Sequence, residues 1–190
     1  ITGASSGNGR AIALTYADHG ADVVVADVRT EPREGGAPTQ ELIQDETDSQ
    51  AAFVDCDVTS KADLEDAMSV AEDFGGVDVM VNNAGIFRGE EFLDVDEAGL
   101  QQFLDVNVKG VFFGSQVAAE RMLQRERSED GAERGSIVNM ASIGAIRALG
   151  RYTCYDLTKG AVISTTYSLA DRLGSEGIRV NAILPGIIGT

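Results

Sequence analysis

The residues that most often bind metals or form disulfides are scarce in this sequence. Two cysteines, Cys56 and Cys154, lie far apart with no partner at a metal-ligand spacing, and His19 is the only histidine. Two cysteines are also too few for a fold held together by disulfides. We therefore expect no metal site, and a Ser-His-Asp triad has little support.

Long apolar runs and basic residues are scarce as well. No apolar run reaches the ~18 residues that a membrane-spanning helix needs, and no signal-peptide pattern is present, so we expect a cytoplasmic protein. The 31 acidic residues outnumber the 15 basic ones, for a net charge of −16. This charge repels phosphodiester backbones and anionic lipid, which argues against nucleic acid and membranes as partners. The acidic surface is either simply well solvated or adapted to high salt, where screening removes self-repulsion.

Short β-branched runs alternate with longer helical patterns along the chain. The runs that favour strands are residues 22–27, 51–58, 77–85, 135–142 and 178–186, and the helical patterns are residues 9–19, 61–74, 96–123 and 155–173. Near-continuous apolar strands are typical of a parallel sheet covered on both faces. The sequence therefore predicts an α/β fold with a doubly wound parallel sheet, a Rossmann-like three-layer sandwich, in a single domain over residues 1–190.

Two polar segments interrupt this alternation. Residues 28–50 mix proline, glycine and charge, and support only a short helix at residues 40–46, so we expect a surface excursion there. Residues 124–135 form a second polar loop, which we interpret as a solvated helix exit.

The chain opens on a glycine-rich stretch, ITGASSGNGR, just before the first helical pattern. A loop between a strand and a helix points unpaired backbone N–H groups at an anion, and the helix dipole assists. Turns also need glycine for positive φ, so the loop alone is compatible with a phosphate cradle or a flexible turn. Asp27 follows at the end of the next strand, where a carboxylate accepts hydrogen bonds from adenosine ribose hydroxyls and repels a 2′-phosphate. This favours NAD over NADP, although Arg10 and Arg29 leave NADP open.

The motifs TGASSGNG (residues 2–9), NNAG (82–85), Ser142, YDLTK (155–159) and PGIIGT (185–190) together resemble those of the short-chain dehydrogenase/reductase family. The likeness covers essentially the whole chain, in the family's order and spacing. It implies an NAD(P)-dependent oxidoreductase that moves a hydride between a substrate carbon and nicotinamide.

The resemblance implies four catalytic residues. Tyr155 would exchange the proton of the substrate hydroxyl, although its ordinary pKa near 10 is too high for an efficient base at neutral pH. Lys159 lies four residues on, on the same helical face. A cation ~4 Å from a phenolate contributes ~4 kcal/mol at an effective dielectric constant of ~20, so we expect Lys159 to lower the pKa of Tyr155. Ser142 would hydrogen-bond the substrate oxygen, and Asn107 would support a water that links the lysine to solvent.

The resemblance also implies which residues contact the cofactor. They are Gly3, Ser5, Ser6, Gly7, Asn8, Gly9, Asp27, Asp57, Val58, Asn83, Ala84, Gly85, Tyr155, Lys159, Pro185, Gly186, Ile188 and Thr190. Asn82 is interpreted as serving the sheet instead. The sequence departs from the family at Asn8, where an aliphatic residue is usual. It also has no full first strand before Thr2 and no substrate loop or further helix and strand after residue 190. We therefore expect the chain to be cut from a longer one at both ends.

The leading hypothesis is an NAD-dependent oxidoreductase that interconverts a secondary alcohol, such as a sugar or polyol, with a ketone. The alternatives are a 3-oxoacyl thioester reductase that uses NADPH, and a non-catalytic dinucleotide sensor. Residues 87–92 and 142–150 are expected to line part of the substrate pocket. By resemblance, we also expect a homodimer or homotetramer paired through the helices predicted at residues 96–123 and 155–173.

Overall fold

The computed structural model describes residues 1–125 and 133–188. Most of the polar loop predicted at residues 124–135, and the predicted cofactor contact Thr190, lie outside the described residues.

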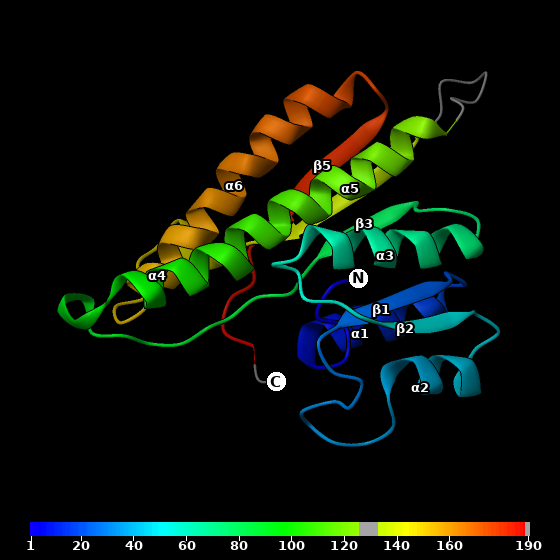
Figure 1. The fold of residues 1–190 in the computed structure, drawn as a ribbon, viewed down its shortest axis with the longest axis horizontal. Coiled ribbons are helices and arrows are strands. Elements are labelled where there is room, and N and C mark those ends of the chain that lie inside the picture. Colours follow the sequence, from blue (N-terminus) through cyan, green and yellow to red (C-terminus); the bar gives the residue numbers. More distant parts are fainter. Residues whose placement is uncertain (126–132, 189–190) are drawn as a thin grey trace.

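The strands form a parallel sheet in two groups that the first residues of the chain join. β1 (Val23–Asp27) pairs with β2 (Ala51–Asp55), and β4 (Gly135–Met140) lies between β3 (Val79–Asn82) and β5 (Ile178–Ile183), all in parallel. Thr2 bridges to Ala26 of β1, and its N–H donates to the Val81 carbonyl of β3 at 3.0 Å. The order is therefore β2, β1, residues 1–2, β3, β4, β5, and the N mark of Figure 1 lies between β1 and β3. Residues 1–2 therefore lie where a central strand would, between β1 and β3.

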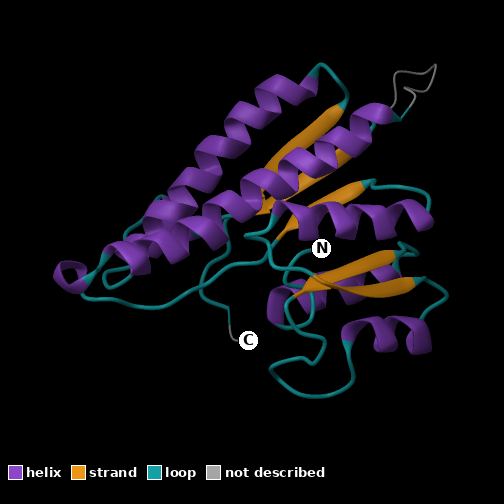
Figure 2. Cartoon of the chain, viewed as in Figure 1, coloured by secondary structure: helices purple, strands orange, loops and turns teal. Residues whose placement is uncertain are grey.

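Helices cover the sheet from both sides (Figures 1 and 2). They are α1 (Gly7–Asp18), α2 (Thr39–Glu46), α3 (Lys61–Asp73), α4 (Glu97–Leu104), α5 (Gly110–Gln124) and α6 (Thr153–Gly174). One core cluster joins α3, α5 and the end of α6 to side chains of β1, β3, β4 and β5. A second joins α1 and α2 to β1 and β2. The α/β Rossmann-like class predicted from the alternation is confirmed.

The alternation of side chains along β1 explains why both faces are apolar. Val23 and Val25 belong to the cluster with α1 and α2, whereas Ala26 belongs to the cluster with α3 and α5. Successive side chains of a strand point to opposite faces, so an unbroken apolar strand needs cover on both. Burial on both faces is the physical reason for the unbroken apolar run of β1.

The long helix predicted at residues 96–123 is interrupted. α4 ends at Leu104, a π-helical turn spans Asp105–Lys109, and α5 begins at Gly110. A π turn accommodates an extra residue and rotates the side chains within it, and such turns often mark functional sites. Asn107, in the middle of this turn, is fully buried.

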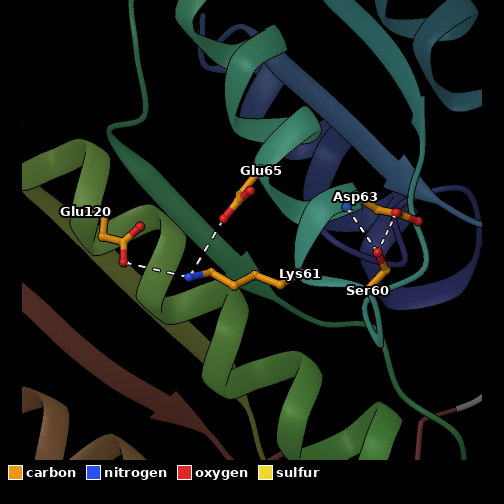
Figure 3. A network of polar contacts seen from close by, with 5 residues as sticks. All are labelled: Ser60, Lys61, Asp63, Glu65 and Glu120. Atoms are coloured by element: carbon orange, nitrogen blue, oxygen red, sulfur yellow. Dashed lines mark hydrogen bonds and ion pairs between the residues drawn. The ribbon is translucent and has the colours of Figure 1, made fainter.

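A polar network fixes the start of α3 and ties it to α5 (Figure 3). The Ser60 hydroxyl accepts from the Asp63 N–H at 3.3 Å and donates to Asp63 Oδ1 at 2.6 Å. Asp63 Oδ2 accepts from the Asp57 N–H at 3.0 Å. Lys61 reaches Glu65 on α3 at 3.7 Å and Glu120 on α5 at 3.9 Å. The cap of α3 therefore also fixes the backbone that follows β2.

The surface excursion predicted at residues 28–50 contains the short helix α2, as expected, but its first part is held against the chain's opening loop. We call residues 29–39 the strap. The Ser5 hydroxyl donates to the Arg29 carbonyl at 2.6 Å, and the Thr39 hydroxyl donates to the Ala4 carbonyl at 2.9 Å. Composition alone indicated a surface excursion but not what holds it, because hydrogen bonds between residues so far apart in sequence have no local signal.

Candidate functional site

The predicted site residues gather at one edge of the sheet. Asp27 ends β1, Asp57 follows β2, Asn83 follows β3, Ser142 follows β4 and Pro185 follows β5. All five strands are parallel, so their carboxyl ends meet at this edge. From the central residues 1–2, the chain first builds the sheet on one side, through β1 and β2, and then on the other side, through β3, β4 and β5. Ligands of such sheets bind where the strand order reverses in this way. The glycine loop, residues 3–9, lies at that point.

The glycine loop has a shape that side chains would destroy. Gly3 and Gly7 have φ values of +65° and +54°, which glycine adopts without strain. A Cβ at Gly9 would collide with the Gly3 carbonyl oxygen and lie 2.5 Å from Asn83 Nδ2. The first turn of α1 is thereby brought close to the end of residues 1–2, with its N–H groups at the sheet edge.

Asn83 and Thr2 hold this loop to β3. Asn83 Nδ2 donates to the carbonyls of Thr2 and Gly3 at 2.9 and 3.1 Å, and Thr2 Oγ1 accepts from the N–H groups of Asn83 and Ala84, both at 3.0 Å. Asn82 turns inward, where Nδ2 donates to Ser115 Oγ and Asn139 Oδ1. The structure thus places Asn82 in the sheet, as interpreted from the sequence, and Asn83 beside the glycine loop.

The acidic residues predicted to face an adenosine lie at the same edge of the sheet, after β1 and β2. Asp27 Oδ2 accepts from the Ser5 N–H at 3.1 Å. The Asp57 side chain is exposed and accepts from the Thr59 N–H at 2.9 Å. Val58 is buried against α5, where a Cβ at Gly110 would lie 2.8 Å from Val58 Cγ2. The loop after β2 is therefore fixed in place, with one exposed carboxylate.

Ser142 and Tyr155 are brought together across the loop that follows β4. Ser142 is buried, and its hydroxyl accepts from the Gly144 N–H at 3.1 Å. Burial raises the pKa of Tyr155 above its ordinary value, a hydrogen bond with Ser142 lowers this pKa, and the charge of Asp156 raises it. The Ser142 hydroxyl therefore lies close enough to the Tyr155 phenol to affect its pKa, as expected of two groups that share one substrate oxygen.

Lys159 is buried next to this pair, with 4% of its surface exposed. Its Nζ donates to the Met140 carbonyl at 2.6 Å and lies 5.6 Å from the centre of the Tyr155 ring. Burial lowers the pKa of Lys159 to about 8. The expected lowering of the pKa of Tyr155 by Lys159 is not found in this arrangement, where burial dominates and the ammonium is directed at a carbonyl. Spacing on a helix could predict the pairing but neither the carbonyl nor the burial.

Asn107 joins three parts of the site. Its Oδ1 accepts from the Ile86 N–H at 2.8 Å, and its Nδ2 donates to the Ile86 carbonyl at 3.0 Å and to Thr158 Oγ1 at 3.1 Å. A Cβ at Gly85 would lie 3.2 Å from Asn107 Oδ1 and 3.6 Å from Lys159 Nζ. The π turn thus places Asn107 between the segment after β3 and α6, and close to the lysine.

Aromatic rings form a wall beside Tyr155. Phe87 stacks on Tyr152 with ring centres 4.5 Å apart and meets Tyr155 edge-on at 4.8 Å. Phe87 is 59% exposed, which suits the expectation that residues 87–92 border a substrate pocket. Pro185, from the predicted cofactor stretch, accepts at its carbonyl from the Ile143 N–H at 3.0 Å. Gly186 and Ile188 follow it and are exposed.

Sequence reasoning missed several residues that shape this site. Asp156 Oδ2 accepts from the Leu149 N–H at 3.0 Å and so holds the loop at residues 142–150. Thr158 links Asn107 to α6. Glu34, in the strap, accepts from the Gly7 N–H at 2.9 Å. The position of Asp156 next to Tyr155 was the one visible signal, because an acid beside a titrating phenol must affect its pKa.

The chain is similar to known proteins in both sequence and fold. The family model described as enoyl-(acyl carrier protein) reductase matches residues 3–190. L-2,3-butanediol dehydrogenase of Corynebacterium glutamicum is 41% identical over 191 residues, covering 100% of this chain and 71% of the relative. Galactitol 2-dehydrogenase of Agrobacterium fabrum is 35% identical, covering 99% and 69%. The solved structure of a short-chain type dehydrogenase/reductase from Mycobacterium marinum matches with a TM-score of 0.85 and 32% identity, covering 98% and 72%.

Proposed function

The chain belongs to the short-chain dehydrogenase/reductase family of oxidoreductases, and we propose on that basis that it interconverts a secondary alcohol and a ketone with NAD as the hydride carrier. The observation that carries this proposal is the placement of Tyr155 beside the buried Lys159, with the buried Ser142 at the end of β4, at the same sheet edge as the glycine loop. Ser142 and Tyr155 can hold one substrate oxygen and exchange its proton.

Each residue of the group has a separate role in this proposal. Ser142 hydrogen-bonds the substrate oxygen and fixes its approach. Tyr155 donates a proton to a ketone oxygen in reduction and accepts it from the alcohol in oxidation. The raised pKa of Tyr155 keeps its phenol protonated at neutral pH, so reduction is favoured there and oxidation at alkaline pH. Lys159 supplies positive charge near the ring, and Asn107 holds Ile86 and Thr158 around it.

The residues present fit a dinucleotide. The glycine loop is shaped by positive φ and by a close approach that a Cβ at Gly9 would block, and the N–H groups of the first turn of α1 suit a diphosphate. Asp27 would accept from the adenosine ribose and disfavour NADP, while Pro185 and Gly186 would border the nicotinamide. The chemistry that a bound nicotinamide supplies is acceptance of the hydride from the carbinol carbon.

The substrate class we propose is a small diol, polyol or sugar. Two relatives of the chain are named for butanediol and galactitol, and the exposed Phe87 ring meets Tyr155 edge-on. We also propose a homodimer or homotetramer. Phe112 on α5 and Leu157 on α6 are exposed, which suits pairing of these helices between subunits.

The test is turnover with the purified protein. Butanediol, galactitol and other secondary alcohols are supplied with NAD, and the absorbance of reduced nicotinamide is followed. Tyr155→Phe is expected to lower kcat by roughly 10²–10⁴-fold, the usual contribution of a general acid–base group. Binding of NADH to the variant, measured by fluorescence, is expected to change little.

The matched control is Tyr167→Phe, the same change on the same helix at a residue that is 73% exposed. It is expected to leave kcat and the melting temperature unchanged. Turnover of a 3-oxoacyl thioester with NADPH, and of no alcohol with NAD, would favour the reductase alternative. Binding of NADH without turnover of any substrate would favour a dinucleotide sensor.

A further inference from the structure

The strap brings a second carboxylate to the glycine loop. Glu34 Oε1 accepts from the Gly7 N–H at 2.9 Å, and Ser6 Oγ accepts from the Arg33 N–H at 2.8 Å. Gly35 and Gly36 follow Glu34 with φ values of +81° and +93°, which make the turn that directs the Glu34 carboxylate back to the loop. The bond from Gly7 lowers the pKa of Glu34, so this side chain is ionised at neutral pH.

The two carboxylates lie on neighbouring N–H groups. Asp27 accepts from Ser5, and Glu34 accepts from Gly7. Ser5 and Gly7 are two residues apart, a separation of at most about 7 Å. The side of the glycine loop that meets the strap therefore carries two negative charges in place of the single one that the sequence indicates.

Three arginines, Arg10, Arg29 and Arg33, lie near the glycine loop or on the strap. Arg10, which kept NADP open in the sequence, is engaged by the strap: Nη1 donates to Thr39 Oγ1 at 2.9 Å and Nη2 to the Ala37 carbonyl at 2.8 Å. Arg29 and Arg33 are exposed on the strap. Arg10, the arginine within α1, therefore already has two hydrogen-bond partners.

We propose that Glu34 is a second determinant of cofactor choice, which excludes a phosphate on the adenosine ribose by placing its carboxylate on the Gly7 N–H beside Asp27. This rests on the proposed function, since it assumes that the adenosine of NAD lies at Asp27. A phosphate of charge near −2 within about 7 Å of a carboxylate is repelled enough to weaken its binding about five- to tenfold, even at the dielectric constant of water. Because Glu34 is exposed, part of this effect is screened by salt.

The test uses cofactor fragments, so it does not depend on turnover. Binding of adenosine 5′-phosphate and of adenosine 2′,5′-bisphosphate is measured by calorimetry, at low and high salt, for the unmodified protein and for Glu34→Gln. The amide keeps an acceptor for the Gly7 N–H but removes the charge. We expect Glu34→Gln to raise the ratio of the affinities for the bisphosphate and the monophosphate about five- to tenfold, and to weaken the salt dependence of that ratio.

Glu31→Gln is the matched control, because it removes the same charge from an exposed residue of the same strap. It is expected to leave the ratio unchanged. An equal gain for both fragments in Glu34→Gln would overturn the proposal and make Glu34 a general competitor for the loop. Tighter binding of the bisphosphate by the unmodified protein would overturn it too, in favour of Arg29 and Arg33. If neither fragment binds to any form, the dinucleotide site itself fails, and with it the proposed function.

Discussion

The charged side chain of Lys159 is buried, which is unfavourable for the stability of the fold. Its ammonium donates a hydrogen bond to the Met140 carbonyl at 2.6 Å, and burial lowers its pKa from 10.5 to about 8. A buried charge costs stability unless nearby groups replace its hydration. A cation kept at a site at the expense of stability is typical of functional residues, whose environments shift pKa values for chemistry.

The effect of Lys159 on stability has a definite sign. Between about pH 8 and pH 10.5 the unfolded chain keeps the proton that the folded chain has lost, so this lysine makes the free energy of unfolding rise with pH across that window. Lys159→Met removes the buried charge and is expected to raise the free energy of unfolding at pH 7 by about 1–3 kcal/mol, while abolishing turnover. Urea unfolding of both proteins at pH 7 and pH 10 measures it.

Only the difference between the two proteins isolates Lys159. Burial raises the pKa of Cys56 to about 12 from 9.0, so Cys56 makes stability fall with pH over an overlapping range. That contribution is the same in the variant and cancels in the difference. If Lys159→Met is less stable at pH 7, or if its advantage is the same at pH 10, the buried cation is not a cost to the fold.

At the scale of single elements, the strands and most helix bounds could be predicted because they follow from local pattern. Helix α6 was expected at residues 155–173 and spans Thr153–Gly174, and the strand expected at 22–27 spans Val23–Asp27. The π turn could not be predicted, because one extra residue within an apolar helix leaves the periodicity nearly unchanged. The strand expected at 77–85 ends at Asn82, because Asn83 and Ala84 turn to the hydroxyl of Thr2.

In the candidate site too, some features could be predicted from local sequence pattern and others could not. Residue types at motif spacings predict which side chains meet at the sheet edge, and the structure places Ser142, Tyr155 and Lys159 close together there. What the spacings cannot predict is the partner of each group. The Met140 carbonyl on Lys159 and the Glu34 carboxylate on Gly7 both come from residues distant in sequence, and each depends on how whole elements pack.

The cap of α3 offers a prediction at this scale. Ser60→Ala removes the acceptor for the Asp63 N–H and the donor to Asp63 Oδ1, and is expected to lower the free energy of unfolding by about 1 kcal/mol, the usual value of such a cap. Chemical unfolding measures the loss. The control is Ser69→Ala in the same helix, where the hydroxyl donates to the Glu65 carbonyl and alanine is the better helix former. An equal loss at both positions would contradict a role for the cap.

The molecule as a whole carries far more negative charge than its ion pairs can balance. Its net charge is −16, and most of the described ion pairs lie at the surface, as in Arg151–Glu91, where the side chains are 72% and 64% exposed. Such pairs contribute little to stability. Repulsion among the excess carboxylates therefore remains in the folded state and is reduced mainly by dissolved ions.

This charge predicts that salt stabilises the fold. The melting temperature is expected to rise as KCl is added, most steeply below about 1 M, where the screening length falls from about 10 Å to about 3 Å. KCl is used in place of a sulfate salt, because sulfate is excluded from protein surfaces and stabilises most proteins whatever their charge. Sucrose is the control for exclusion without screening and should not reproduce the steep early rise. A melting temperature that stays flat or falls with KCl would mean that the acidic surface only solvates the protein, and that adaptation to high salt does not explain it.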